Sequence, residues 1–207
     1  DKAANLIAQE GILAHEAAGH LRYTDFAPWH KLQGTVKSGK DDHLIHTFVN
    51  IIEDARINHL LAQDFPGSGK KLAFVEAWAM QQHKEAFAKN GVPEGTEAKA
   101  AIVALMTEII AKSPHFVDND EVRAFMDEAR PLFKACVSQA DTKGVIRQAR
   151  RLITVYREHF PEGGEDFDPF KDGEGYMVDD MSPEQIEVMA EHQKHCGPLG
   201  DGVSPVR

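Results

Sequence analysis

Cysteine is scarce in this sequence of 207 residues, and basic residues are fewer than acidic ones. Its 2 cysteines, Cys136 and Cys196, lie far apart and outside any CxxC spacing, so we expect reduced thiols in a cytoplasmic protein rather than a disulfide framework. The 33 aspartates and glutamates outnumber the 23 lysines and arginines, which gives a formal net charge of −10. A field of that sign repels nucleic-acid phosphates and anionic lipids, and we expect neither nucleic acid nor a membrane as a partner.

Long apolar runs are missing as well, since none approaches the ~20 residues that a bilayer-spanning helix needs. Hydrophobic residues make up 42% of the chain and charged residues 27%, which fits one globular domain with a large surface relative to its core. The chain opens with Asp1 rather than methionine, and we expect it to be a piece of a longer protein.

Helix-forming residues are abundant, and apolar residues recur at helical spacing along most of the chain. This spacing predicts helices at about residues 3–22, 41–63, 71–89, 96–112, 119–138 and 142–159. Only the short stretch 31–37 (KLQGTVK) has a strand-like composition, and PGSG at 66–69 is expected to break the chain. The sequence therefore predicts a mainly α-helical fold with little or no sheet.

The composition changes after residue 160. Residues 161–181 are acidic and glycine-rich without apolar periodicity, which is typical of a loop or linker. The sequence SPEQ at 182–185 then combines a capping serine, a proline at the first helical position and a glutamine that completes the capping box. We therefore expect a helical domain at 1–160, an acidic loop or linker at 161–181, and a short helix with a mobile tail at 182–207.

The residues best suited to bind a metal or to act in catalysis lie in the first predicted helix. They are His15, Glu16 and His20, in the segment HEAAGH. A zinc hydrolase needs two neutral imidazoles directed at one point, and a carboxylate beside them that takes a proton from water. The usual spacing is HExxH, because residues four apart are only about 40° apart around an α-helix. The alternative is an alanine-rich helix with two unrelated surface histidines.

The spacing in this segment is one residue longer than usual. His15 and His20 are five residues apart, which separates them by about 140° on a straight α-helix. A π-bulge near Gly19 would return both imidazoles to one face, because it inserts one extra residue into a turn. Alternatively, the helix ends near Gly19 and His20 reaches back from a loop.

A second set of candidate ligands lies in the predicted helix 41–63. Glu53 and Asp54 interrupt an apolar run, and a carboxylate buried among apolar residues is costly unless it meets a metal or a cation. The alternative to a metal is a salt bridge from Glu53 or Asp54 to Arg56 or Arg22. One stripe of this helix, followed in steps of three and four residues, contains His46, Asn50, Glu53 and Ile57.

Together, the segments ILAHEAAGHLRYTDF and NIIEDARIN resemble the zinc-peptidase domain that accompanies von Willebrand factor A modules in bacterial and phage proteins. That group is similar to the gluzincins, whose third zinc ligand is a glutamate on a later helix. The resemblance covers about residues 10–60, and the sequence departs from the family pattern, HEAGH, by one extra alanine. It implies His15, His20 and Glu53 as zinc ligands, Glu16 as the general base, and Asp54 as a partner that orients a ligand imidazole.

On this basis we expect a zincin-like helical domain in which two metal-bearing helices pack antiparallel with Zn²⁺ between them. The expected function is a zinc-dependent peptidase that hydrolyses peptide bonds with metal-activated water and Glu16 as the base. Its partners would be a peptide or protein substrate and a von Willebrand factor A domain in the full-length protein. One alternative is a catalytically inactive zincin-like module that serves protein–protein interaction, and another is a helical scaffold without metal.

Two further groups of histidines have weaker claims on a metal. His43 and His46 form an HxxH pair on the second helix, which could supply a fourth ligand but is more typical of a solvated pair. The sequence EHQKHC at 191–196 has suitable side chains, but its place near the end of the chain favours adventitious binding.

Overall fold

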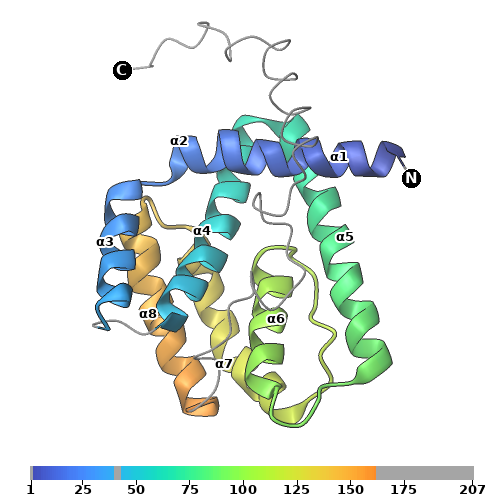
Figure 1. Cartoon of the computed structure of the whole chain (residues 1–207), viewed down its shortest axis with the longest axis vertical. Helices are drawn as coiled ribbons and strands as arrows, with labels where there is room; N and C mark the ends of the chain where they lie inside the picture. Colours follow the sequence, from blue (N-terminus) through green and yellow to red (C-terminus); the bar gives the residue numbers. More distant parts are fainter. Residues whose placement is uncertain (1, 40–42, 162–207) are drawn as a thin grey trace, which may run out of the picture. The chain divides into compact units, whose positions relative to one another are not determined.

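The computed structural model describes residues 2–39 and 43–161, which fold into helices joined by turns and loops (Figure 1). In chain order the elements are α1 (Lys2–Leu13), the π-helix η1 (Ala14–His20), α2 (Leu21–Tyr23), α3 (Phe26–Lys37), α4 (His43–Asp64), α5 (Pro66–Asn90), α6 (Glu97–Ile109), α7 (Asp120–Val137) and α8 (Thr142–His159). No strand occurs within the described ranges, so the predicted mainly α-helical fold is confirmed. The expected linker after Pro161 and the expected helix and tail at 182–207 lie outside these ranges.

Helix α4 forms the centre of this unit. It contacts η1, α3, α5, α6, α7 and α8, and most of its apolar side chains are almost completely buried. Phe48, for example, packs edge to face against Tyr156 of α8, with ring centroids 5.3 Å apart. On a helix enclosed in this way a polar side chain is costly unless it has a partner, so the polar residues of α4 indicate where specific interactions are made.

Residues 31–37, which have a strand-like composition, are helical and belong to α3. Asp25 caps the start of α3 by accepting a hydrogen bond from the Ala27 N–H. Leu32 and Val36, four residues apart, turn one face of this helix into the core. The strand-like composition does not produce a strand, because this four-residue apolar spacing outweighs the β-branched Thr35 between them.

The break expected at 66–69 falls one residue earlier, at Phe65, and α5 already begins at Pro66. Proline suits the first position of a helix, because its missing N–H would have no partner there. Gly69 has a packing role instead, since a Cβ atom at this position would lie 2.7 Å from Cβ of Ala62. The glycine therefore permits a close approach of α4 and α5 just after the turn.

The segment formed by α1, η1 and α2 crosses α4 instead of running antiparallel along it (Figure 1). Helix α1 packs on α5, while η1 packs on α4. In an antiparallel pair, later residues of the segment would contact earlier residues of α4. Yet His20 lies near Asp54, and Tyr23 reaches forward to Asp64. The expected antiparallel arrangement is therefore replaced by a crossing at η1.

The described residues also bear on the expectations about membrane-spanning helices and about the cysteines. None of their helices combines the length and the apolar character that crossing a membrane requires. Cys136 is a free thiol buried in α7, whereas Cys196 lies outside the described ranges.

Candidate metal centre

The segment HEAAGH forms η1, a π-helix that runs from Ala14 to His20. Hydrogen bonds in a π-helix join residues five apart, so residues five apart occupy nearly the same face. The π distortion expected near Gly19 is therefore confirmed, although it extends over 7 residues rather than one bulged position. As a result the rings of His15 and His20 meet edge to face, with centroids 4.8 Å apart and planes at 87°.

Gly19 allows η1 to approach α4 closely. It is the buried residue of η1, and a Cβ atom at this position would lie 3.3 Å from Cδ1 of Ile57 on α4. A larger side chain would push the two helices apart just before His20. The glycine thus brings both histidines up to the polar residues of α4.

His15, His20 and Asp54 form a compact cluster between η1 and α4. The Nε2 atoms of His15 and His20 lie 3.6 and 3.3 Å from Oδ1 of Asp54. The candidate ligand atoms of all three residues lie within 4.8 Å of one another, and the described part of the chain holds no other group of this kind. Oδ1 of Asp54 is buried without a hydrogen bond, so its charge must be balanced by a cation beside it, either a protonated imidazole or a metal ion.

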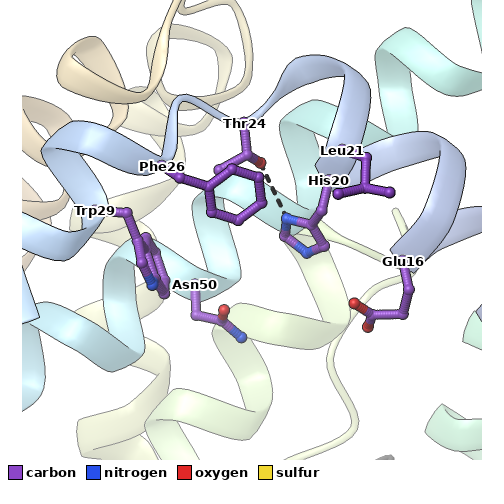
Figure 2. A pocket seen from close by; sticks show the side chains of 7 residues that line it. All are labelled: Glu16, His20, Leu21, Thr24, Phe26, Trp29 and Asn50. Carbon is purple, nitrogen blue, oxygen red and sulfur yellow. Dashed lines mark hydrogen bonds between the residues drawn. The ribbon is translucent and has the colours of Figure 1, made fainter.

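The far side of each imidazole ring is held by a neighbouring side chain. Nδ1 of His15 lies 2.7 Å from Oδ1 of Asn58, and Nδ1 of His20 lies 3.0 Å from Oγ1 of Thr24 (Figure 2). The amide nitrogen of Asn58 donates to Glu76 at 3.0 Å, which keeps the amide oxygen directed at His15. With the hydrogen on Nδ1 of each ring, both Nε2 lone pairs are directed at the cluster.

Strong electrostatic coupling links the members of the cluster. Burial disfavours the charged form of His15, but the nearby carboxylate of Asp54 outweighs it and raises the pKa of His15 to about 9. Burial also disfavours the charged form of Asp54, but the two histidines outweigh it and lower the pKa of Asp54 to about 2. In the metal-free protein at neutral pH, His15 is therefore protonated beside an ionised Asp54, and a metal ion must displace that proton.

Glu16 lies beside the cluster, where it meets solvent. Its Oε1 atom is 4.0 Å from Nε2 of His15, and 52% of its side chain is exposed. A cleft of about 280 Å³ opens next to it, lined by Glu16, His20, Leu21, Thr24, Phe26, Trp29 and Asn50. Figure 2 shows Glu16 and His20 on one side of this cleft and the aromatic rings of Phe26 and Trp29 on the other.

Glu53, expected as the third zinc ligand, is engaged elsewhere. It is completely buried and forms an ion pair with Arg56, whose Nε and Nη2 atoms donate to the two carboxylate oxygens at 2.8 and 2.7 Å. The salt-bridge alternative therefore describes Glu53, and the adjacent Asp54 takes the place at the histidines. Neighbouring residues of an α-helix are about 100° apart, so the two carboxylates are directed to different sides of α4.

The other residues considered as metal ligands or as partners of the site either contact different residues or lie outside the described part of the chain. His46 packs against Trp29, with ring centroids 4.8 Å apart. The side chain of His43 and the segment 191–196 lie outside what the structure describes. Arg22, the other possible salt-bridge partner of Glu53 or Asp54, pairs instead with Asp64.

Three features of the site were not expected from the sequence, namely Asn58, Thr24 and the place of Asp54 as a member of the cluster. For two of these a signal was present, because Asn50, Asp54 and Asn58 are each four residues apart and form a polar stripe on a buried helix. Thr24 carries no such signal, since its position depends on how the chain turns between α2 and α3.

No family model, curated protein or solved structure matches this chain. The resemblance to the zinc-peptidase domain thus rests on the two sequence motifs, and the function is inferred below from the geometry of the cluster.

Proposed function

We propose that this protein is a zinc-dependent hydrolase of peptide bonds, with His15, His20 and Asp54 as zinc ligands and Glu16 as the general base. The observation that carries the proposal is the convergence of two imidazole Nε2 atoms on a buried carboxylate oxygen without a hydrogen-bond partner. Two nitrogens and one oxygen are a ligand set used by catalytic zinc sites, which keep a further position open for water or substrate.

The distance from each imidazole nitrogen to the carboxylate oxygen of Asp54 suits zinc. Ligands about 2.0–2.1 Å from a tetrahedral zinc ion lie about 3.3 Å from one another. The two Nε2–Oδ1 separations are 3.6 and 3.3 Å. The same donor set can hold Fe(II) in oxygenases. Glu16 favours zinc hydrolysis over that alternative, because a carboxylate next to the metal is the base that hydrolysis needs.

Each residue of the site has a defined task in this reaction. Zinc, when bound, supplies Lewis acidity that polarises the scissile carbonyl and lowers the pKa of a water molecule. Asn58 and Thr24 hold the two imidazoles in the tautomer that leaves Nε2 available. Glu16 takes a proton from the attacking water and delivers it to the leaving amine.

The cleft beside His20 favours a substrate with an apolar side chain near the scissile bond. Leu21, Phe26 and Trp29 supply apolar walls, and none of the lining residues is a lysine or an arginine that could neutralise an acidic group. Its volume of about 280 Å³ is just below the range of about 300–1,000 Å³ typical of small-ligand sites, so it suits one side chain rather than a long segment. Glu16 at its edge would further repel an acidic side chain.

Zinc binding is expected to release about one proton per zinc ion at pH 7.5. The pKa of His15 is raised to about 9, so His15 is almost fully protonated at that pH and must lose its proton to become a ligand. The contribution of His15 to this release should disappear as the pH rises above 9, where its imidazole is already neutral before zinc binds. Calorimetric titration in two buffers of different ionisation enthalpy measures this number, and no release at pH 7.5 would show that His15 does not bind the metal.

The experiment that tests the function is metal removal and return on the full chain. Two matched sets of fluorogenic peptides would differ at one residue, leucine or phenylalanine in one set and aspartate in the other. We expect hydrolysis to stop with a chelator, to return with one equivalent of zinc, and to be about tenfold or more faster for the apolar peptides. Hydrolysis that persists without metal, or no cleavage of any peptide by the zinc-loaded chain, would contradict the proposal.

A further inference from the structure

Glu53 is the centre of a buried polar network that joins α4 to the turn after α2. Glu53, Arg56 and Thr142 are each at most 1% exposed. Arg56 donates two hydrogen bonds to the Glu53 carboxylate, and the hydroxyl of Thr142, the first residue of α8, donates to the Oε1 atom of Glu53 at 2.9 Å. The side chains of Arg56 and Thr142 therefore both donate hydrogen bonds to the carboxylate of Glu53.

The same network also forms hydrogen bonds to the backbone of the turn between α2 and α3, at the residue before Thr24 and at the residue after it. Nη2 of Arg56 donates to the backbone oxygen of Tyr23 at 2.7 Å. The backbone N–H of Asp25 donates to the hydroxyl of Thr142 at 2.8 Å. Thr24 lies between these two anchored residues and has an extended backbone, with φ −84° and ψ 127°. Its position is thus fixed by hydrogen bonds to the residue before it and the residue after it.

Thr24 is the residue that holds His20. Its hydroxyl contacts Nδ1 of His20, as the dashed line in Figure 2 marks, and its backbone N–H donates to the carbonyl of His20 at 3.0 Å. A threonine hydroxyl can orient an imidazole only while its own backbone is held in place. The chain of contacts therefore runs from Glu53 through the turn to the ring of His20.

We propose that Glu53, Arg56 and Thr142 are positioning residues that hold His20 in its ligating orientation through Thr24. The inference rests on the metal site proposed above, and it gives the carboxylate expected as a ligand a different role. Outer partners of a metal ligand typically account for about 10–100-fold in metal affinity. A buried ion pair is weak as a stabilising device, because apolar residues of similar volume often stabilise as well or better. Its presence beside the candidate metal centre is therefore better explained by orientation.

Thr142 offers the cleanest test of this role. The cap of α8 is Asp141, whose side chain accepts from the Gly144 N–H, so the hydroxyl of Thr142 is not needed to begin the helix. The variant Thr142→Val keeps the shape of the side chain and removes only the hydroxyl. Glu53 then keeps its ion pair with Arg56, but the Asp25 side of the turn loses its anchor.

The matched control is Thr107→Val. Thr107 is a buried threonine of α6 whose hydroxyl donates to the backbone oxygen of Val103, outside the network. A second variant, Thr142→Ser, keeps the hydroxyl. All variants are compared as full chains at a temperature where circular dichroism shows them folded. The readouts are zinc affinity by competition with a chromophoric chelator and the visible spectrum of the Co²⁺-substituted protein, which reports ligand geometry.

We expect Thr142→Val to lower zinc affinity about 10–100-fold and to change the Co²⁺ spectrum. Thr142→Ser and Thr107→Val should match the wild type in both readouts. Equal affinity and spectrum for Thr142→Val, or the same loss in Thr107→Val, would overturn the positioning role. A wild type that binds no zinc would overturn it together with the metal site. A wild type that binds zinc but cleaves no peptide would contradict only the proposed hydrolysis, and the Thr142 comparison would still decide this inference.

Discussion

Asp54→Asn is expected to abolish saturable zinc binding, whereas Glu53→Gln is expected to bind one equivalent at saturating zinc. Oδ1 of Asp54 is the atom on which both imidazoles converge, and an amide in its place is a poor, uncharged ligand. Glu53 already has Arg56 and Thr142 as partners, so its loss should weaken zinc binding only through the orientation of His20. Elemental analysis and chelator competition measure both variants.

In stability the order of the two variants should be reversed. Glu53→Gln, which keeps its zinc, should lose more free energy of unfolding than Asp54→Asn, which does not. Removing the charge of Glu53 leaves Arg56 buried without its counter-ion, which typically costs about 3–5 kcal/mol. Asp54→Asn should cost less, because His15 can lose its proton when its partner is neutral, whereas the guanidinium of Arg56 stays charged. Urea unfolding of the metal-free proteins checks this order. Zinc lost from Glu53→Gln but kept in Asp54→Asn, each in its folded fraction, would restore Glu53 as the ligand.

Glu16→Gln is expected to lower peptide hydrolysis by a factor of about 10²–10⁴ while leaving zinc content unchanged. Glutamine keeps the size of the side chain but cannot accept the proton of the attacking water. Glu16 is adjacent to His15 but is not one of the three clustered residues, so the metal should remain. Initial rates with the apolar peptides and zinc content of the same samples give the two numbers.

Glu10→Gln is the control for this variant. Glu10 lies on α1, five residues before His15, and is paired with Lys71. Its substitution should leave hydrolysis near the wild-type rate. If Glu16→Gln hydrolysed peptides as fast as the wild type, the base would have to be another residue. If the zinc-loaded wild type were inactive on all peptides, the interaction module considered from the sequence would become the better account.

Much of the helical fold could be predicted from apolar spacing alone. The clearest cases are the last two helices, whose expected ranges 119–138 and 142–159 differ from α7 and α8 by at most one residue at either end. Spacing works there because each helix buries one face and exposes the other. The crossing of α1–η1–α2 over α4 could not be predicted, because it depends on which helices compete for the same face of α4.

The π-helix could be predicted because a five-residue spacing between two candidate ligands has few solutions on a helix. The sequence could not show which of Glu53 and Asp54 is the ligand. Both are adjacent acidic residues on one helix, and a rotation of that helix by about 100° exchanges their roles. Only the packing of η1 through Gly19 against Ile57 determines which of the two carboxylates meets the histidines.

Thr24 and Thr142 show a further limit of sequence reasoning. They are joined through Asp25 and Glu53 by hydrogen bonds that span the chain from residue 25 to residue 142. No local pattern reports such a contact, because each threonine lies in an ordinary turn or helix start. Orienting contacts of this long-range kind are therefore found only from the structure.

The most direct test of the account is a crystal structure of the zinc-soaked or zinc-purified chain with anomalous data collected at the zinc edge. The account predicts one strong anomalous peak about 2.0–2.2 Å from Nε2 of His15, Nε2 of His20 and one carboxylate oxygen of Asp54. It also predicts that Glu53 remains bound to Arg56. A peak coordinated by Glu53, or the absence of any peak between η1 and α4, would contradict it.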